Sequence, residues 1–128
     1  MAEPAWRELE LRARLLTGGK LTPGSGNKNI KGDVVLPSVI IECKYSSQET
    51  FTIQYEWLRR LELFNPSKEC ILYCGTKTRN FCYYLSRSTS RPQSWKTRTL
   101  HINKLPLFIG TEAFVWTLED EDFLRQFR

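Results

Sequence analysis

Three charged side chains, Asp33, Glu42 and Lys44, lie inside two short apolar runs of the sequence, residues 32–36 and 39–45. Both runs are rich in β-branched residues and only a Pro-Ser pair separates them, which predicts a β-hairpin. In a symmetric hairpin centred on that pair, facing residues have numbers that add up to 75. The pattern therefore places Asp33 opposite Glu42.

Two carboxylates that face each other across an antiparallel pair repel, because their β-carbons are only roughly 4.5–5.5 Å apart. A divalent cation removes this repulsion, and Mg²⁺ prefers carboxylate, water and phosphate oxygens as ligands. Side chains alternate along a strand, so Lys44 is expected on the same side as Glu42, roughly 6–7 Å away. An ammonium group there orients or activates a water, or neutralises charge on a phosphate. A Glu-x-Lys on a strand is also a common surface ion pair, so the triplet alone leaves both interpretations open.

The same residues resemble the core of PD-(D/E)XK nucleases, with Gly32-Asp33 in the PD position and Glu42-Cys43-Lys44 as (D/E)XK. The preceding PGSGNKNIKGDV, residues 23–34, is similar to archaeal-type Holliday junction resolvases and their phage-borne relatives. The resemblance covers about residues 3–75. It implies a homodimeric endonuclease that uses Mg²⁺, with Mn²⁺ as an alternative, to cut branched DNA at four-way junctions, in a host cell if phage-encoded.

The resemblance also implies roles for individual residues. A helix-borne glutamate completes the metal site, and by its distance from the glycine pair at 18–19 Glu10 is preferred, with Glu8 as the alternative and Glu3 a weaker one. The implied metal ligands are Asp33, Glu42, Glu10 and the backbone carbonyl of Cys43. The implied DNA contacts are Lys20, Ser25, Lys28 and Lys31, with the Ser25 hydroxyl also supporting catalysis. An ordinary helical pair of Glu10 with Arg14 is compatible with either choice of glutamate.

Residues 17–32 join the first helix to the hairpin and contain five glycines and three lysines. Glycine lets the backbone approach another chain closely, so this segment is suited to contact with a partner. The segment lacks the Gly-Lys-Ser/Thr ending of a phosphate-binding P-loop. An ordinary surface connection is the alternative interpretation.

The flanking sequence predicts the elements that position these residues. A helix over 3–16 is expected to bury Trp6, Leu9, Ala13 and Leu16, and it ends before the glycine pair. A second helix is expected over 50–63, with an apolar stripe of Ile53, Trp57, Leu58 and Leu61, with Arg59 and Arg60 pointing away, and with Gln54 as a further candidate site residue. Strands are expected at 69–75, 81–87 and 99–103, and a turn at 76–80 connects the first two. A short helix is expected within 118–128.

The order of these elements, αβββαβ, predicts one α/β domain over residues 1–128, in which helices flank a central mixed β-sheet. The third early strand is not evident from periodicity. Either residues 22–30 supply it or the hairpin begins the sheet. The PD-(D/E)XK (restriction-endonuclease-like) core follows from the resemblance alone.

Composition is consistent with this interpretation. A chain of 128 residues suffices for one hydrophobic core, and a net charge of +5 with pI near 9.2 favours a polyanionic partner. Four cysteines lie in apolar, strand-like runs without metal-binding spacing, so buried free thiols are expected at Cys43, Cys70, Cys74 and Cys82. No apolar run is long enough to span a membrane and the first residues lack a signal-peptide core, so a cytoplasmic protein without a membrane partner is expected.

The sequence is also compatible with other functions. The same core suits nucleases that cut duplex ends, flaps or a specific sequence, and a non-catalytic DNA-binding module is a further alternative. A basic stretch with one tryptophan, residues 88–99, is either a nucleic-acid contact or a solvated loop. The large apolar residues near the C-terminus are candidates for a dimer interface or for the core: Phe114, Trp116, Phe123 and Phe127.

Overall fold

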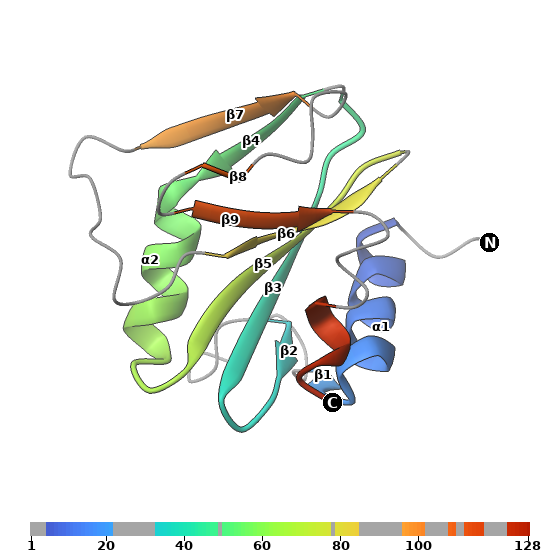
Figure 1. The fold of residues 1–128 in the computed structure, drawn as a ribbon, viewed down its shortest axis with the longest axis vertical. Coiled ribbons are helices and arrows are strands. Elements are labelled where there is room, and N and C mark those ends of the chain that lie inside the picture. Colours follow the sequence, from blue (N-terminus) through green and yellow to red (C-terminus); the bar gives the residue numbers. More distant parts are fainter. Residues whose placement is uncertain are drawn as a thin grey trace.

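A mixed β-sheet forms the centre of the molecule, and one helix lies against each of its faces (Figure 1). The computed structural model describes residues 5–21, 33–48, 50–77, 79–84, 96–101, 108–109, 112–116 and 123–128. Seven strands follow the order β1 (Lys20–Leu21), β2 (Val34–Val35), β3 (Val39–Tyr45), β5 (Glu69–Gly75), β6 (Asn80–Tyr84), β9 (Glu112–Trp116) and β8 (Phe108–Ile109). Strands β3 and β5 are parallel and the other described pairs are antiparallel. The predicted α/β domain with a central mixed sheet is therefore confirmed.

The helices α1 (Ala5–Thr17) and α2 (Tyr55–Phe64) each bury an apolar stripe on the sheet. Alternation along β3 sends Ile40 into the core beneath α2 and Ile41 into the core beneath α1. Leu58 and Leu61 of α2 share the first core, and the buried residues of α1 share the second, namely Leu9, Ala13 and Leu16. The predicted faces of the Glu-x-Lys strand are thus confirmed, with Glu42 and Lys44 on the α2 side.

The hairpin of β2 and β3 has the predicted register. Val34 pairs with Ile41 and Val35 with Ile40, and the Leu36 amide donates to the Val39 carbonyl at 2.8 Å across the Pro-Ser turn. Each of these pairs has numbers that add up to 75. The predicted pairing ends at Val34, because the Asp33 amide donates to the Ile41 carbonyl at 2.7 Å. Asp33 therefore lies beside β3 but does not form the predicted facing pair with Glu42.

The predicted second helix is wrong in its first half. Residues 50–54 form strand β4 (Thr50–Gln54), which pairs with β7 (Thr97–His101) in a separate two-stranded sheet. Buried Phe51 and Ile53 alternate with exposed Thr52 and Gln54, which is the period of a strand. Gln54 consequently ends β4 and precedes α2, whereas the sequence prediction placed it on a helix.

Other predicted elements differ in detail. Trp6 is 52% exposed, so the buried face of α1 begins one turn later than predicted. Strand β1 supplies the third early strand at Lys20 and Leu21, and residues 22–30 lie outside the described part. The prediction at 69–75 matches β5. Strand β6 begins one residue before the predicted 81–87 and β7 two residues before the predicted 99–103, and residues 85–87 and 102–103 lie outside the described part.

The C-terminal part contains a strand that the sequence analysis did not predict. Two of the proposed interface residues, Phe114 and Trp116, lie in β9, where they pair with Tyr83 and Phe81 of β6. The other two, Phe123 and Phe127, pack against the core beneath α1, with their ring centroids 5.5 Å apart. Only residues 123–125 of the predicted terminal helix are helical in the described part.

The four cysteines are buried within strands β3, β5 and β6, as predicted, and none of the four forms a disulfide. Within the described ranges, neither helix has the length and apolar character that crossing a membrane requires.

Candidate active site

The site lies where β2 ends beside the middle of β3. The Asp33 amide donates to the Ile41 carbonyl at 2.7 Å, and Asp33 Oδ2 accepts a hydrogen bond from the Cys43 amide, also at 2.7 Å. The carboxylate thus replaces the main-chain acceptor that β2 would offer if it continued. Because the amide and carbonyl of one strand residue point the same way, the Cys43 carbonyl is also directed toward the β2 edge.

Glu42 and Lys44 lie side by side on the α2 face of β3. Their charged groups form an ion pair, with Glu42 Oε2 and Lys44 Nζ 3.6 Å apart. The Lys44 ammonium also lies over the indole of Trp57 on α2, 4.6 Å from the ring centroid. Both contacts limit the freedom of a long side chain, so the ammonium is held beside Glu42.

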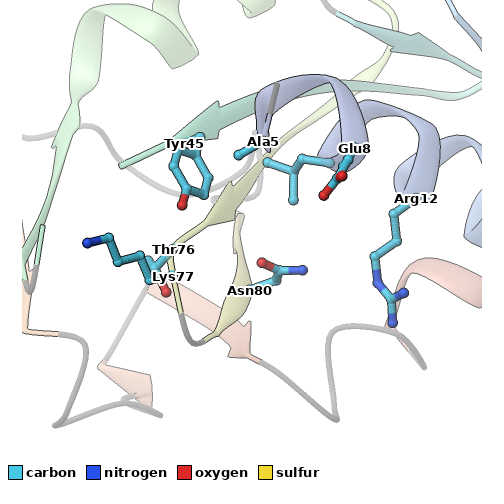
Figure 2. Close-up of a pocket in the computed structure, with 8 residues that line it drawn as sticks. Ala5, Glu8, Arg12, Tyr45, Thr76, Lys77 and Asn80 are labelled. Atoms are coloured by element: carbon cyan, nitrogen blue, oxygen red, sulfur yellow. The ribbon is translucent and has the colours of Figure 1, made fainter. Parts of the chain in front are cut away.

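Glu10 reaches the same region from α1. Its carboxylate pairs with Arg7 at 3.5 Å, in place of the pairing with Arg14 considered from the sequence, and it interacts electrostatically with Asp33. Glu8 instead lines a hollow at the carboxyl end of β3, beyond Lys44 (Figure 2). Of the two glutamates, Glu10 is therefore the one directed toward the carboxylates.

The three acids share an environment that disfavours charge. Burial raises the pKa of Asp33, against the hydrogen bond from Cys43 and the charge of Lys44, which lower it. Burial also raises the pKa of Glu42; Lys44 lowers it and the charge of Asp33 raises it. For Glu10, burial and then Asp33 raise the pKa, and Arg7 lowers it. A cation bound among these groups would relieve both the burial penalty and the mutual repulsion.

The donor atoms suit a hard divalent cation. They are carboxylate oxygens from Asp33, Glu42 and Glu10, together with the Cys43 carbonyl, and Mg²⁺ takes oxygen ligands of this kind. Among the described residues, no three His, Cys, Asp or Glu side chains converge into a ready ligand group. An ion held here would complete its coordination with water or substrate oxygens, as Mg²⁺ commonly does.

Arg60 also acts on the site, although the sequence analysis did not name it as a site residue. Arg60 is exposed on α2, as predicted, yet its charge lies close enough to lower the pKa of Glu42. Its spacing of three residues from Trp57 was the available signal, because residues i and i+3 of a helix share a face.

The remaining predicted DNA contacts are only partly placed. Lys20 is exposed on β1 and pairs with Val35. Ser25, Lys28 and Lys31 lie outside the described residues, as does most of the basic stretch 88–99.

In comparisons with known proteins, no family model matches the chain and no curated protein matches it.

Proposed function

We propose that this protein is a Mg²⁺-dependent DNA endonuclease of the PD-(D/E)XK type that resolves four-way junctions. The observation that carries the proposal is the placement of Asp33 and Glu42, two half-buried and electrostatically coupled carboxylates, next to the restrained ammonium of Lys44. A structural ion pair would not require a second carboxylate beside it. This combination suits phosphodiester hydrolysis with a metal ion.

The order of the elements supports the same proposal. α1, three strands, α2 and β5 follow one another in the αβββαβ order expected of the nuclease core, with β4 added before α2. The parallel pairing of β3 with β5 places the Glu-x-Lys strand inside the sheet. Glu42 and Lys44 are thereby held on the backbone of a strand paired within the sheet, as catalytic geometry requires.

Each residue has a distinct role in the proposed reaction. Asp33, Glu42, Glu10 and the Cys43 carbonyl would hold the cation, which when bound polarises the scissile phosphate and makes a bound water more acidic. Lys44 orients the attacking water and offsets the negative charge that develops on the phosphate. The water oxygen bonds to phosphorus, the bond from phosphorus to O3′ breaks, the water proton passes to solvent, and O3′ takes a proton from solvent.

A homodimer follows from the proposed substrate. Two symmetric cuts across a four-way junction require two sites related by a twofold axis, and one chain supplies one site.

The test is a cleavage assay with four-way junction, flap and linear duplex DNA, with and without Mg²⁺. The wild-type chain is expected to cut the junction in preference to the linear duplex, and only with the metal. Asp33→Asn and Glu42→Gln should bind the junction but not cut it. The matched control is Glu56→Gln, because Glu56 is an exposed acid on α2 that pairs with Arg59 away from the site.

The outcomes separate the alternatives. Normal cleavage by both site variants would refute the site. Equal cutting of junction and linear duplex would leave a nuclease without junction preference, and metal-independent binding without any cutting would leave a DNA-binding module.

A further inference from the structure

A hollow of about 360 Å³ lies at the carboxyl ends of the parallel strands β3 and β5, beside the first turns of α1 (Figure 2). Tyr45 ends β3, and Thr76 and Lys77 directly follow β5. In open α/β sheets, ligands bind at the carboxyl ends of parallel strands. The residues proposed to hold the metal, Asp33, Glu42, Glu10 and Cys43, do not line this hollow, whereas Glu8, the alternative to Glu10 in the sequence, does.

Tyr45 gives the hollow an aromatic wall. Its side chain is 38% exposed, yet its ring packs on β5 at Gly75, where an added Cβ would lie 3.2 Å from Tyr45 Cδ2. The same Cβ would meet both terminal carbons of Leu9 on α1 at 3.1–3.2 Å. The absence of a side chain at Gly75 therefore lets the ring settle against the sheet, which makes Tyr45 an accessible and fixed stacking surface.

The middle of the hollow offers a hydrogen-bond donor and acceptors, which are the carboxamide of Asn80 and the carboxylate of Glu8. Asn80 Nδ2 donates to the hydroxyl of fully buried Tyr73 at 3.4 Å, which orients the Asn80 carboxamide. The Glu8 carboxylate lies across from it (Figure 2). The Thr76 hydroxyl is engaged with Arg79 within its own turn. An amide and a carboxylate beside an aromatic face match the polar edge and flat surface of a nucleobase.

The cationic groups lie at the two ends of the hollow. The Lys77 ammonium extends on the side of Tyr45, whereas the Arg12 guanidinium lies at the opposite end (Figure 2). Cations flanking a stacking surface are typical of proteins that follow the backbone of a single strand. The acid in the middle argues against a phosphate at the centre of the hollow.

The hollow is adjacent to the candidate active site along β3. Tyr45 follows Lys44 directly and lies two residues beyond Cys43 on the same face, or roughly 6–7 Å along the strand. Lys44 extends on the α2 side of β3 and Tyr45 on the α1 side, so the ammonium and the hollow lie on either side of the carboxyl end of this strand. A DNA strand that crosses this end of β3 can contact Lys44 with a phosphate and the hollow with a neighbouring nucleotide.

We propose that this hollow binds one unstacked nucleobase next to the cleaved phosphate, by stacking on Tyr45 and by hydrogen bonding to Asn80 and Glu8. This inference rests on the proposed nuclease function and adds a physical source for its selectivity. Extracting a base from an intact duplex costs free energy, and the cost is smaller where the base is already unpaired. Branched DNA fills the hollow more readily than linear duplex.

The test measures binding of junction and linear duplex DNA to the full chain carrying Asp33→Asn, without Mg²⁺. Tyr45→Ala is expected to weaken junction binding by about 5- to 100-fold, as loss of one base stack does elsewhere, and to change linear duplex binding less than about threefold. Tyr45→Phe should retain junction binding. Tyr45→Leu keeps an apolar side chain against Gly75 and Leu9, so this variant should fold normally. It is expected to lose junction binding as Tyr45→Ala does, and that loss would be due to the missing aromatic ring.

A matched control and a base reporter complete the experiment. Phe64→Ala removes an aromatic side chain of similar exposure, 43%, at the end of α2, and should leave junction binding unchanged. A 2-aminopurine at the branch point should be quenched on binding when Tyr45 is present and less so in Tyr45→Leu.

Distinct results would overturn this inference and the proposed function. Unchanged junction binding in Tyr45→Leu, or equal losses for junction and linear duplex, would refute the nucleobase site while leaving cleavage by the wild-type chain as evidence for the nuclease. Binding of deoxyadenosine monophosphate as tight as that of junction DNA would instead identify a small-molecule site. No cleavage of any DNA by the wild-type chain would refute the function itself.

Discussion

Replacing Asp33 tests the structural part of the site separately from its chemistry. Asp33→Ala and Asp33→Asn remove the same charge, but only asparagine keeps an oxygen that can accept the hydrogen bond from the Cys43 amide, which is 2.7 Å long in the wild-type chain. Cys43 is buried, so alanine leaves that amide without its acceptor. We expect Asp33→Ala to be less stable than Asp33→Asn by about 1–3 kcal/mol, or roughly 3–15 °C in melting temperature for a domain of this size.

The hydrogen bond to Asp33 stabilises the fold, whereas the negative charge of the Asp33 carboxylate should destabilise it. Burial raises the pKa of Asp33, so the folded state holds a proton on this carboxyl more tightly than the unfolded state does. Stability from this source is complete at acidic pH, below the ordinary value of 3.8, and is lost as pH rises through the higher value of the folded state. Asp33→Asn avoids this loss, so its stability relative to the wild type should increase from acidic to neutral pH.

The assay is thermal unfolding of the three proteins in the presence of a chelator, at several values between acidic and neutral pH. Equal destabilisation by alanine and asparagine would refute the role of Asp33 as the acceptor that ends β2. A wild-type protein that gains stability over Asp33→Asn as pH rises would refute the reasoning about the charge.

Four other predictions concern separate parts of the molecule. At saturating junction DNA, Glu10→Gln should reduce the cleavage rate at least about 10-fold and Glu8→Gln less than about threefold, because Glu10 interacts with Asp33 whereas Glu8 lines the hollow and is expected to act on binding. Trp57→Leu should lower the cleavage rate at saturating DNA by about 2- to 30-fold and Trp57→Phe by less, because the indole positions Lys44 at 4.6 Å; unchanged rates in Trp57→Leu would exclude that role. Mg²⁺ at tenfold its dissociation constant should stabilise the wild type by about 1.4 kcal/mol in thermal unfolding, and Glu42→Gln by much less. Leu61→Ala should cost about 2–5 kcal/mol in urea unfolding because Leu61 is fully buried, whereas Leu63→Ala, at a position 75% exposed, should change stability by less than about 0.5 kcal/mol.

The parts of the fold set by local rules were predictable from the sequence. The Pro-Ser turn fixes the hairpin register, and the two faces of β3 follow from the strand period alone. The apolar run of β5 likewise matched its strand. In each case the residues that decide the structure are close together in the chain.

The predicted secondary structure was wrong where pairing with residues far away in the chain determines the conformation. Ile53 has helical spacing to Trp57 and Leu61, so the pattern suggested one long helix, but pairing of β4 with β7, more than forty residues away, holds residues 50–54 extended. Alternation of Phe51 and Ile53 with polar residues was a competing local signal. Strand β9 depends on its pairing with β6, and no local feature separates its apolar run from a buried loop.

The site was predicted to a similar extent. Asp33, Glu42 and Lys44 come together through hairpin geometry, which a sequence pattern encodes. The preference for Glu10 over Glu8 depends on how α1 lies across the sheet, and the approach of Arg60 to Glu42 depends on how α2 packs. The spacing of Glu10 from the glycine pair and of Arg60 from Trp57 indicates which side of each helix a residue occupies, but how each helix lies on the sheet is decided by contacts between residues far apart in the chain.

The Cys43 thiol lies between Glu42 and Lys44 in the sequence but on the opposite face of β3. Burial raises its pKa well above the ordinary value, and the charges of Asp33 and Glu10 raise it further. Since the thiolate is the form that alkylating reagents and peroxide attack, this sulfur is unreactive as long as the strand stays in place. The rate at which Cys43 is alkylated, followed by peptide mass spectrometry, therefore reports how often the segment that carries Glu42 and Lys44 unfolds locally. The wild-type chain already carries this probe, so no label has to be introduced.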